Sequence, residues 1–531
     1  AGLLLAVALE LGPPAQPVAA AAAALLATRA GLELVPWLDV PWDNTFAVFS
    51  PSQNYSYPFL LLTVLLIARF LRQGGLRTLA PLAVLLLLGS GVKATTLPVV
   101  LSGLLLAVAV SVVCRAPWRR AALLASVAAV ALAVGTVVIG AGGSTGSGVQ
   151  LLSTLRRNAV YHEFIGLSAT QARVAGGLVL PGLALPGAAL VAALLLWATV
   201  LKYLWVLPGA AVLGVRRGQV DPVAWFLLGG GLSGWLLMLL VDQSGLSQVY
   251  FLSTGVVLWF LLAAWGLVEL WHRATEQHGR VRTTRVVLAS SLAAAVLARL
   301  LGLLSPERPA LDGTAAGLAV VLVPAAVIFV AVGAVVLVQA RSGGGALGGL
   351  ALGAGLVAVS IAGTVVLTAT PTEAREPGRN AVTAAETSAA RWLAERAGAH
   401  DVVATNVHCL RPRANAPCDA RAFWVSALTR RRVFIGGWAY LDETRAAAAR
   451  RGPPGVDQPF HDQEAFRLNE RLFTDPTPET ATELRRRGVT WVFADVRRGE
   501  VSDRLAQVAQ LVHSTADVDV YRLAPVALPS P

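Results

Sequence analysis

Apolar runs long enough to cross a lipid bilayer recur along the first two thirds of this chain. Its 531 residues include 55% hydrophobic and only 14% charged residues, and the mean hydropathy is +0.64. Soluble globular chains carry about 25% charged residues. A helix needs about 20 apolar residues to cross the bilayer core. The sequence therefore predicts a polytopic α-helical membrane domain and excludes a soluble globular protein.

We expect about 11–12 transmembrane helices in residues 1–369, which form the multi-pass domain. Small residues are frequent in several runs and allow close packing of membrane helices. The first run, 1–11, is too short to span, and the chain does not begin with Met. We therefore expect an N-terminally truncated sequence. After that partial run, the expected spans are 15–32, 57–72, 78–91, 97–114, 121–140, 185–205, 222–241, 249–270, 286–304, 315–340 and 344–368.

Basic residues in the connecting loops predict the orientation of these helices. Thirteen arginines, including Arg69, Arg120 and Arg285, fall in alternate loops, whereas the other loops hold five basic residues. Cytoplasmic loops are enriched in Lys and Arg, so the arginine-rich loops are expected in the cytoplasm. The last span then runs outward, which predicts a plasma-membrane protein with an extracytoplasmic tail. The net charge of +12 is therefore explained by arginines that orient the membrane helices, and it does not imply nucleic-acid binding.

The tail, residues 370–531, is expected to form a small soluble α/β domain. It is charged, lacks an 18-residue apolar run, and alternates helix-like with strand-like segments. Such alternation is typical of α/β folds. Strands are expected at 401–405, 431–437, 489–496 and 517–523, and helices at 387–397 and 478–487.

Two cysteines of the tail, Cys409 and Cys418, lie in the segment HCLRPRANAPC. An oxidising extracytoplasmic compartment favours a disulfide between them, with free thiols as the alternative. A metal site that includes the adjacent His408 lacks a fourth ligand at the usual spacing, so no metal ligands are assigned.

The loop 33–56, expected on the outer side, is acidic and aromatic and contains no basic residue. An interfacial belt explains the aromatic residues, because Trp and Tyr favour the headgroup level. The alternative is a loop that carries carboxylates at an active site open to the outer face. Asp39 and Asp43 are the catalytic candidates in that case.

A second outer loop, 141–177, contains STLRRNAVYHEF. Its adjacent Arg156 and Arg157 suit a phosphate, because guanidinium groups offer paired planar donors. Pairing with lipid headgroups is the alternative. His162 and Glu163 follow closely and are candidates for a base and its partner.

Lys93 lies in GSGVKATTLP, between two expected spans, and faces outward in the predicted orientation. It is one of only two lysines in a chain with 43 basic residues. A phosphate loop is excluded, because Val92 separates Gly91 from Lys93 and Ala94 stands where Ser or Thr is required. A compact ammonium here binds a lipid phosphate or lies among headgroups.

Another outer hairpin is flanked by Asp242, Gln248 and Tyr250. A polar group at a helix end is stable when wetted, so capping is the simplest role. The functional alternative is a set of side chains that line a cavity.

Three segments of the tail, SAARWLAERAGAHDVVATN, RRVFIGGWAYLDETR and TELRRRGVTWVFAD, carry a family resemblance, as do KATTLPVVLSG and SQVYFLSTG in the membrane part. They resemble the GT-C superfamily of polyprenyl-phosphate-dependent glycosyltransferases, especially uncharacterised actinobacterial members. The preference for arginine over lysine fits a GC-rich genome. Trp438 and Tyr440 of the GWAY turn join the cavity candidates on this basis.

The resemblance implies transfer of a hexosyl or pentosyl group from a polyprenyl-phosphate donor to a cell-envelope glycan or protein on the outer face. A carboxylate would act as general base toward the acceptor hydroxyl. Lys93, Arg156 and Arg157 would stabilise the departing phosphate. The family's catalytic carboxylate lies in the first outer loop, upstream of these residues, so Asp39 and Asp43 match at most a second acidic loop. A divalent cation is an open question.

The alternatives are a transporter or lipid flippase, and a non-catalytic membrane scaffold whose tail binds the cell envelope. A transporter needs ionisable groups near the middle of several spans. The expected spans are nearly free of acidic residues, which disfavours proton coupling. A deep outward cavity that joins Lys93, Arg156, Asp43 and the tail favours the enzyme, and a closed bundle favours the scaffold.

Overall fold

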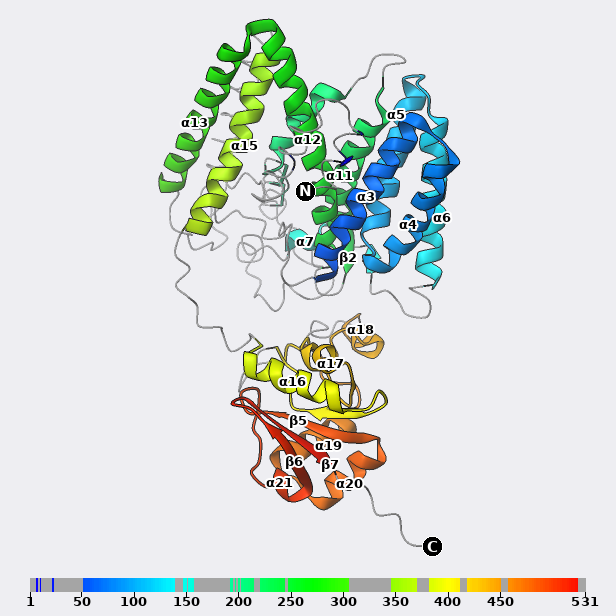
Figure 1. Ribbon diagram of the computed structural model, residues 1–531, viewed down its shortest axis with the longest axis vertical. Helices are drawn as coiled ribbons and strands as arrows, with labels where there is room; N and C mark the ends of the chain where they lie inside the picture. The colour runs from blue at the N-terminus through cyan, green and yellow to red at the C-terminus, as the bar shows by residue number, and fades with distance from the viewer. Residues whose placement is uncertain are drawn as a thin grey trace, which may run out of the picture. The chain divides into compact units, whose positions relative to one another are not determined.

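The chain forms two compact units, Ala1–Ala172 with Gly176–Thr370 and Arg173–Ala175 with Pro371–Pro531. Each unit has its own hydrophobic core. The computed structural model (Figure 1) describes residues 6–7, 10, 22, 51–138, 147–149, 151–156, 192–193, 196, 199–200, 202–213, 220–243, 247–304, 345–369, 382–410, 418–449 and 457–523.

The first unit is built mainly of helices. A short antiparallel pair, β1 (Ser147–Val149) and β2 (Val241–Gln243), lies next to the C-terminal end of one of them. The helices are α3 (Pro51–Gln73), α4 (Leu76–Val92), α5 (Thr96–Val113), α6 (Arg119–Val138), α7 (Ser153–Arg156), the 3-10 helix η2 (Leu204–Val212), α11 (Pro222–Leu240), α12 (Val249–His278), α13 (Arg280–Leu304) and α15 (Ala346–Ala369).

Among the described residues, five helices are long and apolar enough to cross a membrane, which makes this a multi-pass membrane protein. The expected spans at 15–32, 185–205 and 315–340 lie mostly outside the described residues. The expected total of about 11–12 spans therefore stays a prediction. The five helices are Tyr55–Gln73, Thr96–Val113, Arg119–Val138, Pro222–Leu240 and Val249–His278, and shorter apolar helices occupy Leu76–Gly89 and Ala346–Ala358.

Small residues bring α5, α11 and α12 into close contact. A Cβ atom on Gly103 would lie 2.6 Å from the Phe226 carbonyl oxygen, and one on Gly234 would lie 2.5 Å from the Phe251 carbonyl oxygen. Both distances are shorter than van der Waals contact, so only glycine fits. This packing matches the use of small residues between membrane helices.

The second unit is an α/β domain. Its elements are α16 (Ala384–Arg396), β3 (Val402–Thr405), α17 (Trp424–Thr429), β4 (Arg432–Val433), α18 (Asp442–Ala449), α19 (Gln463–Thr474), α20 (Pro478–Arg486), β5 (Val489–Asp495), α21 (Leu505–Val508), β6 (Ala509–Ser514) and β7 (Val518–Leu523).

The strands form one mixed sheet in the order β4-β3-β5-β7-β6. β4, β3 and β5 are parallel, whereas β7 pairs antiparallel with both β5 and β6. Successive residues of β5 point to opposite faces. Trp491 and Phe493 pack with α16 and α17 on one face, and Val492 and Ala494 pack with α19 and α20 on the other. Both faces are thus covered, and β5 is almost wholly buried.

Local sequence explains several element boundaries of this unit. Thr383 caps α16 in a capping box: its hydroxyl accepts from Glu386 N, and Glu386 Oε2 accepts from Thr383 N. Pro478 at the first position of α20 follows the cap residue Thr477. Strands and helices occur in all the expected segments of the tail, but β6 was not predicted.

The expected strand at 431–437 is much shorter in the structure, where β4 contains only Arg432 and Val433. Gly437 N instead donates to the Ala422 carbonyl oxygen at 3.2 Å, outside the sheet. The chain therefore leaves the sheet early, because its backbone groups find partners in the loop before α17.

Candidate functional site

A buried polar cluster lies at one end of the first unit, where α3, α5 and α12 begin. Gln53 Nε2 donates to Thr254 Oγ1 at 3.4 Å, and the hydroxyls of Thr95 and Thr254 are 3.3 Å apart. Gln248, the residue before α12, and Tyr57, one turn after Gln53, are buried at the same end. Polar side chains are costly in an apolar bundle, so their convergence marks this end as a candidate site.

Lys93 is the charged member of this cluster. It follows the last residue of α4, and its backbone N–H donates to the Gly89 carbonyl oxygen, which ends the helix. A cation is favourable there because the C-terminal end of a helix carries partial negative charge. Lys93 Nζ lies 3.7 Å from the centroid of the Tyr250 ring. A cation–π contact of this kind contributes about 0.5–2 kcal/mol.

Two buried oxygen atoms of the cluster, Gln53 Oε1 and Thr96 Oγ1, have no hydrogen-bond partner among the described residues. A buried acceptor without a donor costs about 1–3 kcal/mol. These two oxygens are enclosed by protein, whereas Lys93 is only partly buried and is the charged group of the cluster that solvent reaches.

The opposite end of the first unit carries arginines that hold the helices together. Arg72 forms an ion pair of 2.9 Å with Asp221, which caps α11 through Val223 N. Arg120 Nη1 donates to the carbonyl oxygens of Leu71 and Arg72 at 3.2 and 2.6 Å, at the end of α3. These contacts satisfy helix termini, so the role of these arginines is structural.

The structure brings together Lys93 and Tyr250 from the sequence-based candidates. Gln248 is buried at the same end, at the start of α12. Arg156 ends α7 and Asp242 lies in β2, but the positions of their side chains are not described. Asp39, Asp43, Arg157, His162 and Glu163 lie outside the described residues.

Sequence analysis missed Gln53, Tyr57, Thr95 and Thr254. Helical spacing was the available signal, because residues four apart lie on one face of a helix. Gln53 and Tyr57 are related in this way, and so are Tyr250 and Thr254. Both pairs were overlooked because the spans were identified by their apolar residues alone.

In the second unit, polar side chains gather where the parallel strands β3 and β5 end. Asn406 Nδ2 donates to the Asp495 carbonyl oxygen, and Asp495 N donates to Asn406 Oδ1, both at 2.9 Å. Carboxyl ends of parallel strands are common positions for ligand sites. The amide of Asn406 here bridges the two strands instead.

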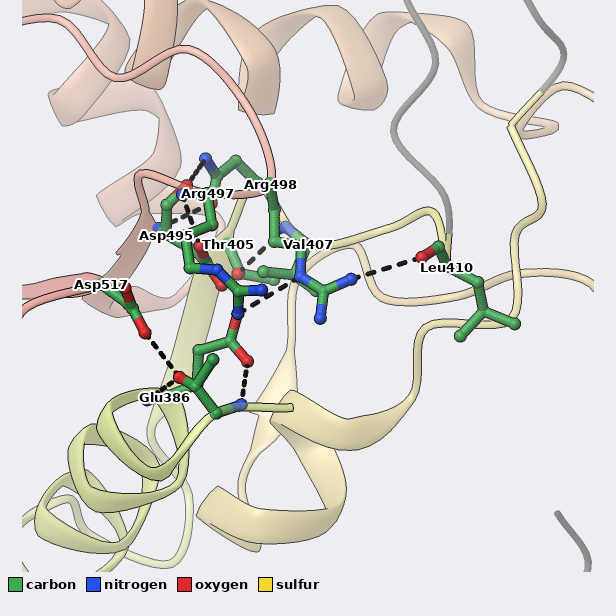
Figure 2. A network of polar contacts seen from close by, with 10 residues as sticks. Glu386, Thr405, Val407, Leu410, Asp495, Arg497, Arg498 and Asp517 are labelled. Carbon is green, nitrogen blue, oxygen red and sulfur yellow. Dashed lines mark hydrogen bonds and ion pairs between the residues drawn. The ribbon is translucent and has the colours of Figure 1, made fainter. Parts of the chain in front are cut away.

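A buried ion-pair network joins the start of α16 to the residues after β5 (Figure 2). The Glu386 carboxylate accepts from Arg497 Nη1 at 2.9 Å and from Arg498 Nε at 3.3 Å. Arg498 Nη1 also donates to the Leu410 carbonyl oxygen at 3.3 Å. Glu386 and Arg498 are nearly inaccessible to solvent, so the network fixes these segments rather than contacting a ligand.

Asp495 lies beside this network and has an unusual pKa. Burial and, to a smaller extent, the neighbouring Glu386 carboxylate together raise the pKa of Asp495 to about 7. Asp495 Oδ1 accepts from Arg497 N at 2.8 Å, whereas the buried Oδ2 has no hydrogen-bond partner among the described residues. Asp495 is fully buried, so its raised pKa does not mark a ligand site.

His408 forms a second buried contact after β3. Its Nε2 lies 2.9 Å from Glu470 Oε1, and its ring packs near Trp438 and Phe466. Asn469 Nδ2 reaches the Thr405 carbonyl oxygen at 3.0 Å. Trp438, a sequence-based cavity candidate, is buried, and its Nε1 donates to the Gln458 carbonyl oxygen at 2.7 Å. These contacts belong to the core of the unit.

A disulfide joins Cys409 and Cys418. Among the described residues, no three His, Cys, Asp or Glu side chains gather as metal ligands. Tyr440, the other residue singled out in the GWAY turn, has an exposed side chain.

An open groove of about 650 Å³ runs along α16. Its lining includes Thr383, Thr387, Arg391 and Trp392. The Trp392 ring is stacked on His513, with centroids 4.4 Å apart, and Arg396 Cζ lies 4.4 Å from the ring centroid. The aromatic surface of the groove is thus occupied by neighbouring side chains, and no site is assigned to it.

Comparison with protein-family models gives no match, and no curated protein matches the chain. Among solved structures, one similar chain is ArnT from Cupriavidus metallidurans, in a crystal structure bound to undecaprenyl phosphate. The similarity covers 99% of this chain and 85% of the ArnT chain, at 14% sequence identity and a TM-score of 0.32. It is too distant to assign a family or an activity.

Proposed function

We propose that this chain is a membrane glycosyltransferase of the GT-C type. It transfers a sugar from a polyprenyl-phosphate donor to a cell-envelope glycan or protein on the outer face of the plasma membrane. The observation that carries the proposal is Lys93, a cation placed against the Tyr250 ring where the polar ends of several helices meet.

The family resemblance supports this choice through two segments of the membrane part. KATTLPVVLSG begins with Lys93, and SQVYFLSTG contains Tyr250 and Thr254. These segments are more than 150 residues apart in sequence, yet the Lys93–Tyr250 contact and the Thr95–Thr254 contact bring them together. The residues that carry the resemblance in this part of the chain thus form one cluster.

The chemistry of the cluster suits a lipid phosphate as leaving group. Negative charge grows on the phosphate as the glycosidic bond breaks, and the Lys93 ammonium stabilises that charge. The face of the Tyr250 ring holds the ammonium in place. A carboxylate from an outer loop acts as general base toward the acceptor hydroxyl, for which Asp39 and Asp43 are the candidates.

The proposed orientation places Lys93 and the second unit outside the cytoplasm. The charge distribution supports it, because Arg72, Arg77, Arg119 and Arg120 lie at the end of the helices opposite Lys93. A transporter is less well supported. The described spans before α12 contain no Asp or Glu, so they provide no intramembrane carboxylate for proton coupling.

The test is transfer of radiolabelled sugar from a polyprenyl-phosphate donor by the full-length protein. Lys93→Met is expected to lower kcat/KM for the donor by about 10- to 100-fold, the effect of losing a charged hydrogen bond to phosphate. Tyr250→Leu is expected to lower it by about 3- to 10-fold, whereas Tyr250→Phe, which keeps the ring, retains activity.

Arg119→Met is the matched control, since it removes the same charge from an exposed position at the opposite end. Transfer that survives Lys93→Met unchanged refutes the assigned role. Binding of polyprenyl phosphate without any transfer would identify a lipid-binding scaffold or flippase instead.

A further inference from the structure

An exposed aromatic and ion-paired surface lies on the second unit, before α17. The segment 419–423 alternates Asp419, Arg421 and Phe423 with Ala420 and Ala422. The two alanines are buried and the three larger side chains reach solvent. Arg421 N donates to the Asp419 carbonyl oxygen at 2.7 Å, which turns the chain at Ala420. The Asp419 and Arg421 side chains contact each other, and Tyr440 contacts both Arg421 and Phe423, so these side chains form one surface.

Hydrogen bonds from neighbouring segments hold the segment 419–423 in place. Leu410 N donates to the Asp419 carbonyl oxygen at 2.9 Å, and Ala439 N donates to the Ala420 carbonyl oxygen at 3.1 Å. The Cys409–Cys418 disulfide ties the same two stretches of chain covalently. Trp438 and other buried side chains pack beneath. The surface is therefore supported by fixed backbone on both sides and by core below.

Two aromatic rings form part of this surface. Phe423 and Tyr440 are 37% and 46% exposed, their ring centroids are 5.6 Å apart, and their planes differ by 22°. A Cβ atom on Gly437 would lie 2.8 Å from Phe423 Cε1, so glycine at that position lets the Phe423 ring rest against the backbone. The two rings thus form a rigid apolar surface that is exposed to solvent.

An ion pair stands beside the rings. Arg421 Nε and Nη2 donate to Asp419 Oδ1 and Oδ2 at 2.7 and 2.6 Å, a planar bidentate contact. These bonds hold the pKa of Arg421 above its ordinary value, and Tyr440 adds a smaller contribution. A guanidinium has five N–H donors and each carboxylate oxygen has two lone pairs, so the pair keeps capacity for further hydrogen bonds.

We propose that the surface formed by Asp419, Arg421, Phe423 and Tyr440 binds a neutral glycan chain. A sugar ring has an apolar C–H face, which fits an aromatic ring, and hydroxyl edges, which fit a planar group with paired donors and acceptors. Specific ligand sites combine apolar rings with a few fixed polar groups in this way. Nothing in the proposal requires the transfer reaction.

The net charge of this surface favours a neutral ligand over an anionic membrane. Asp419 and Arg421 cancel, so the four described side chains of this surface carry no net charge. Binding to anionic lipid depends on an excess of positive charge. A neutral linear oligosaccharide needs no opposite charge on the protein. Successive sugar units can contact the Asp419–Arg421 ion pair and the two aromatic rings.

The experiment measures binding of linear oligosaccharides to the full chain in nanodiscs by saturation-transfer NMR and titration. The probes are oligosaccharides of glucose, mannose, galactose and arabinose, with no lipid donor present. Tyr440→Ala is expected to weaken binding by about 2- to 10-fold, and Phe423→Ala/Tyr440→Ala together by more than about 10-fold. Arg421→Lys keeps the positive charge but removes the paired planar donors of the guanidinium group. It is expected to weaken binding by about 2- to 10-fold.

Leu441→Ala is the matched control, because Leu441 is exposed to a similar extent beside Tyr440 but has no ring. It is expected to leave affinity within about 2-fold of the parent. Hydrogen exchange of β3 and β5 reports whether each variant keeps its fold. The proposal is wrong if no oligosaccharide binds, if binding survives the double substitution, or if Leu441→Ala weakens it equally. Lys93→Met should not alter this binding, so the result is independent of the transferase assignment.

Discussion

The raised pKa of Asp495 predicts that the second unit loses stability as the pH rises. The folded-state pKa is about 7, whereas the ordinary value is 3.8. The folded state therefore binds the proton more tightly than the unfolded state does, and the free energy of unfolding falls between about pH 4 and pH 7. Each unit of pKa difference corresponds to about 1.4 kcal/mol, so the total loss is about 4 kcal/mol. Above pH 7 this contribution is constant.

Asp495→Asn should remove this dependence. The amide has the shape of the protonated carboxyl: its oxygen accepts from Arg497 N, and its neutral NH₂ group is not repelled by the Glu386 carboxylate. Below about pH 4, where Asp495 is protonated in both the folded and the unfolded state, the variant and the parent should have similar stability. At pH 8 the variant should be more stable, by up to about 4 kcal/mol.

Hydrogen–deuterium exchange of the full chain, followed by mass spectrometry, measures this difference. The slowest amides of β3 and β5 report the free energy of unfolding of the second unit, after correction for the intrinsic effect of pH. Asp503→Asn, a change at an exposed carboxylate, is the control and should shift stability by less than about 0.5 kcal/mol. Parallel pH profiles for the parent and Asp495→Asn between pH 5 and pH 8 would refute the reasoning.

Two further predictions concern packing and the disulfide. Gly234→Ala places a Cβ atom 2.5 Å from a carbonyl oxygen of α12 and should destabilise the first unit by about 1–3 kcal/mol, whereas Gly89→Ala, with no atom near its Cβ, should not. Thermal denaturation followed by size-exclusion chromatography tests this pair, and equal melting temperatures would contradict it. Cys409→Ser/Cys418→Ser should destabilise the second unit by about 2–3 kcal/mol, measured by exchange of β3, and unchanged exchange would contradict it.

The helices of the first unit were predictable because a bilayer imposes a length and a composition on every span. The runs from 57–72 to 121–140 coincide with α3 to α6 within a few residues. Contacts between helices were not predictable in the same way. Gly103 and Gly234 are ordinary small residues in the sequence, and only the crossing of α5, α11 and α12 shows that nothing larger fits.

In the second unit, β5 was predictable because VTWVFAD is apolar at five of its seven positions, as a central strand buried on both faces requires. β6, with the sequence AQLVHS, lies at the edge of the sheet and has mostly accessible residues. Its pattern resembles that of a loop, which is why it was missed. The Asp419–Arg421 pair was equally hidden, since an acid and a base two residues apart are common in loops.

The choice of lysine at position 93 has a physical reason that the structure makes visible. At the opposite end, Arg120 uses its guanidinium to bond two carbonyl oxygens at the end of α3, a task that needs several donors in a fixed plane. Lys93 lies over a ring face, where the attraction depends on a compact charge and sets no fixed donor direction. A compact ammonium with rotatable N–H groups can hold this contact and still turn a donor toward a phosphate. Arginine thus suits the helix ends that need several fixed donors, and lysine suits the contact with a ring face at position 93.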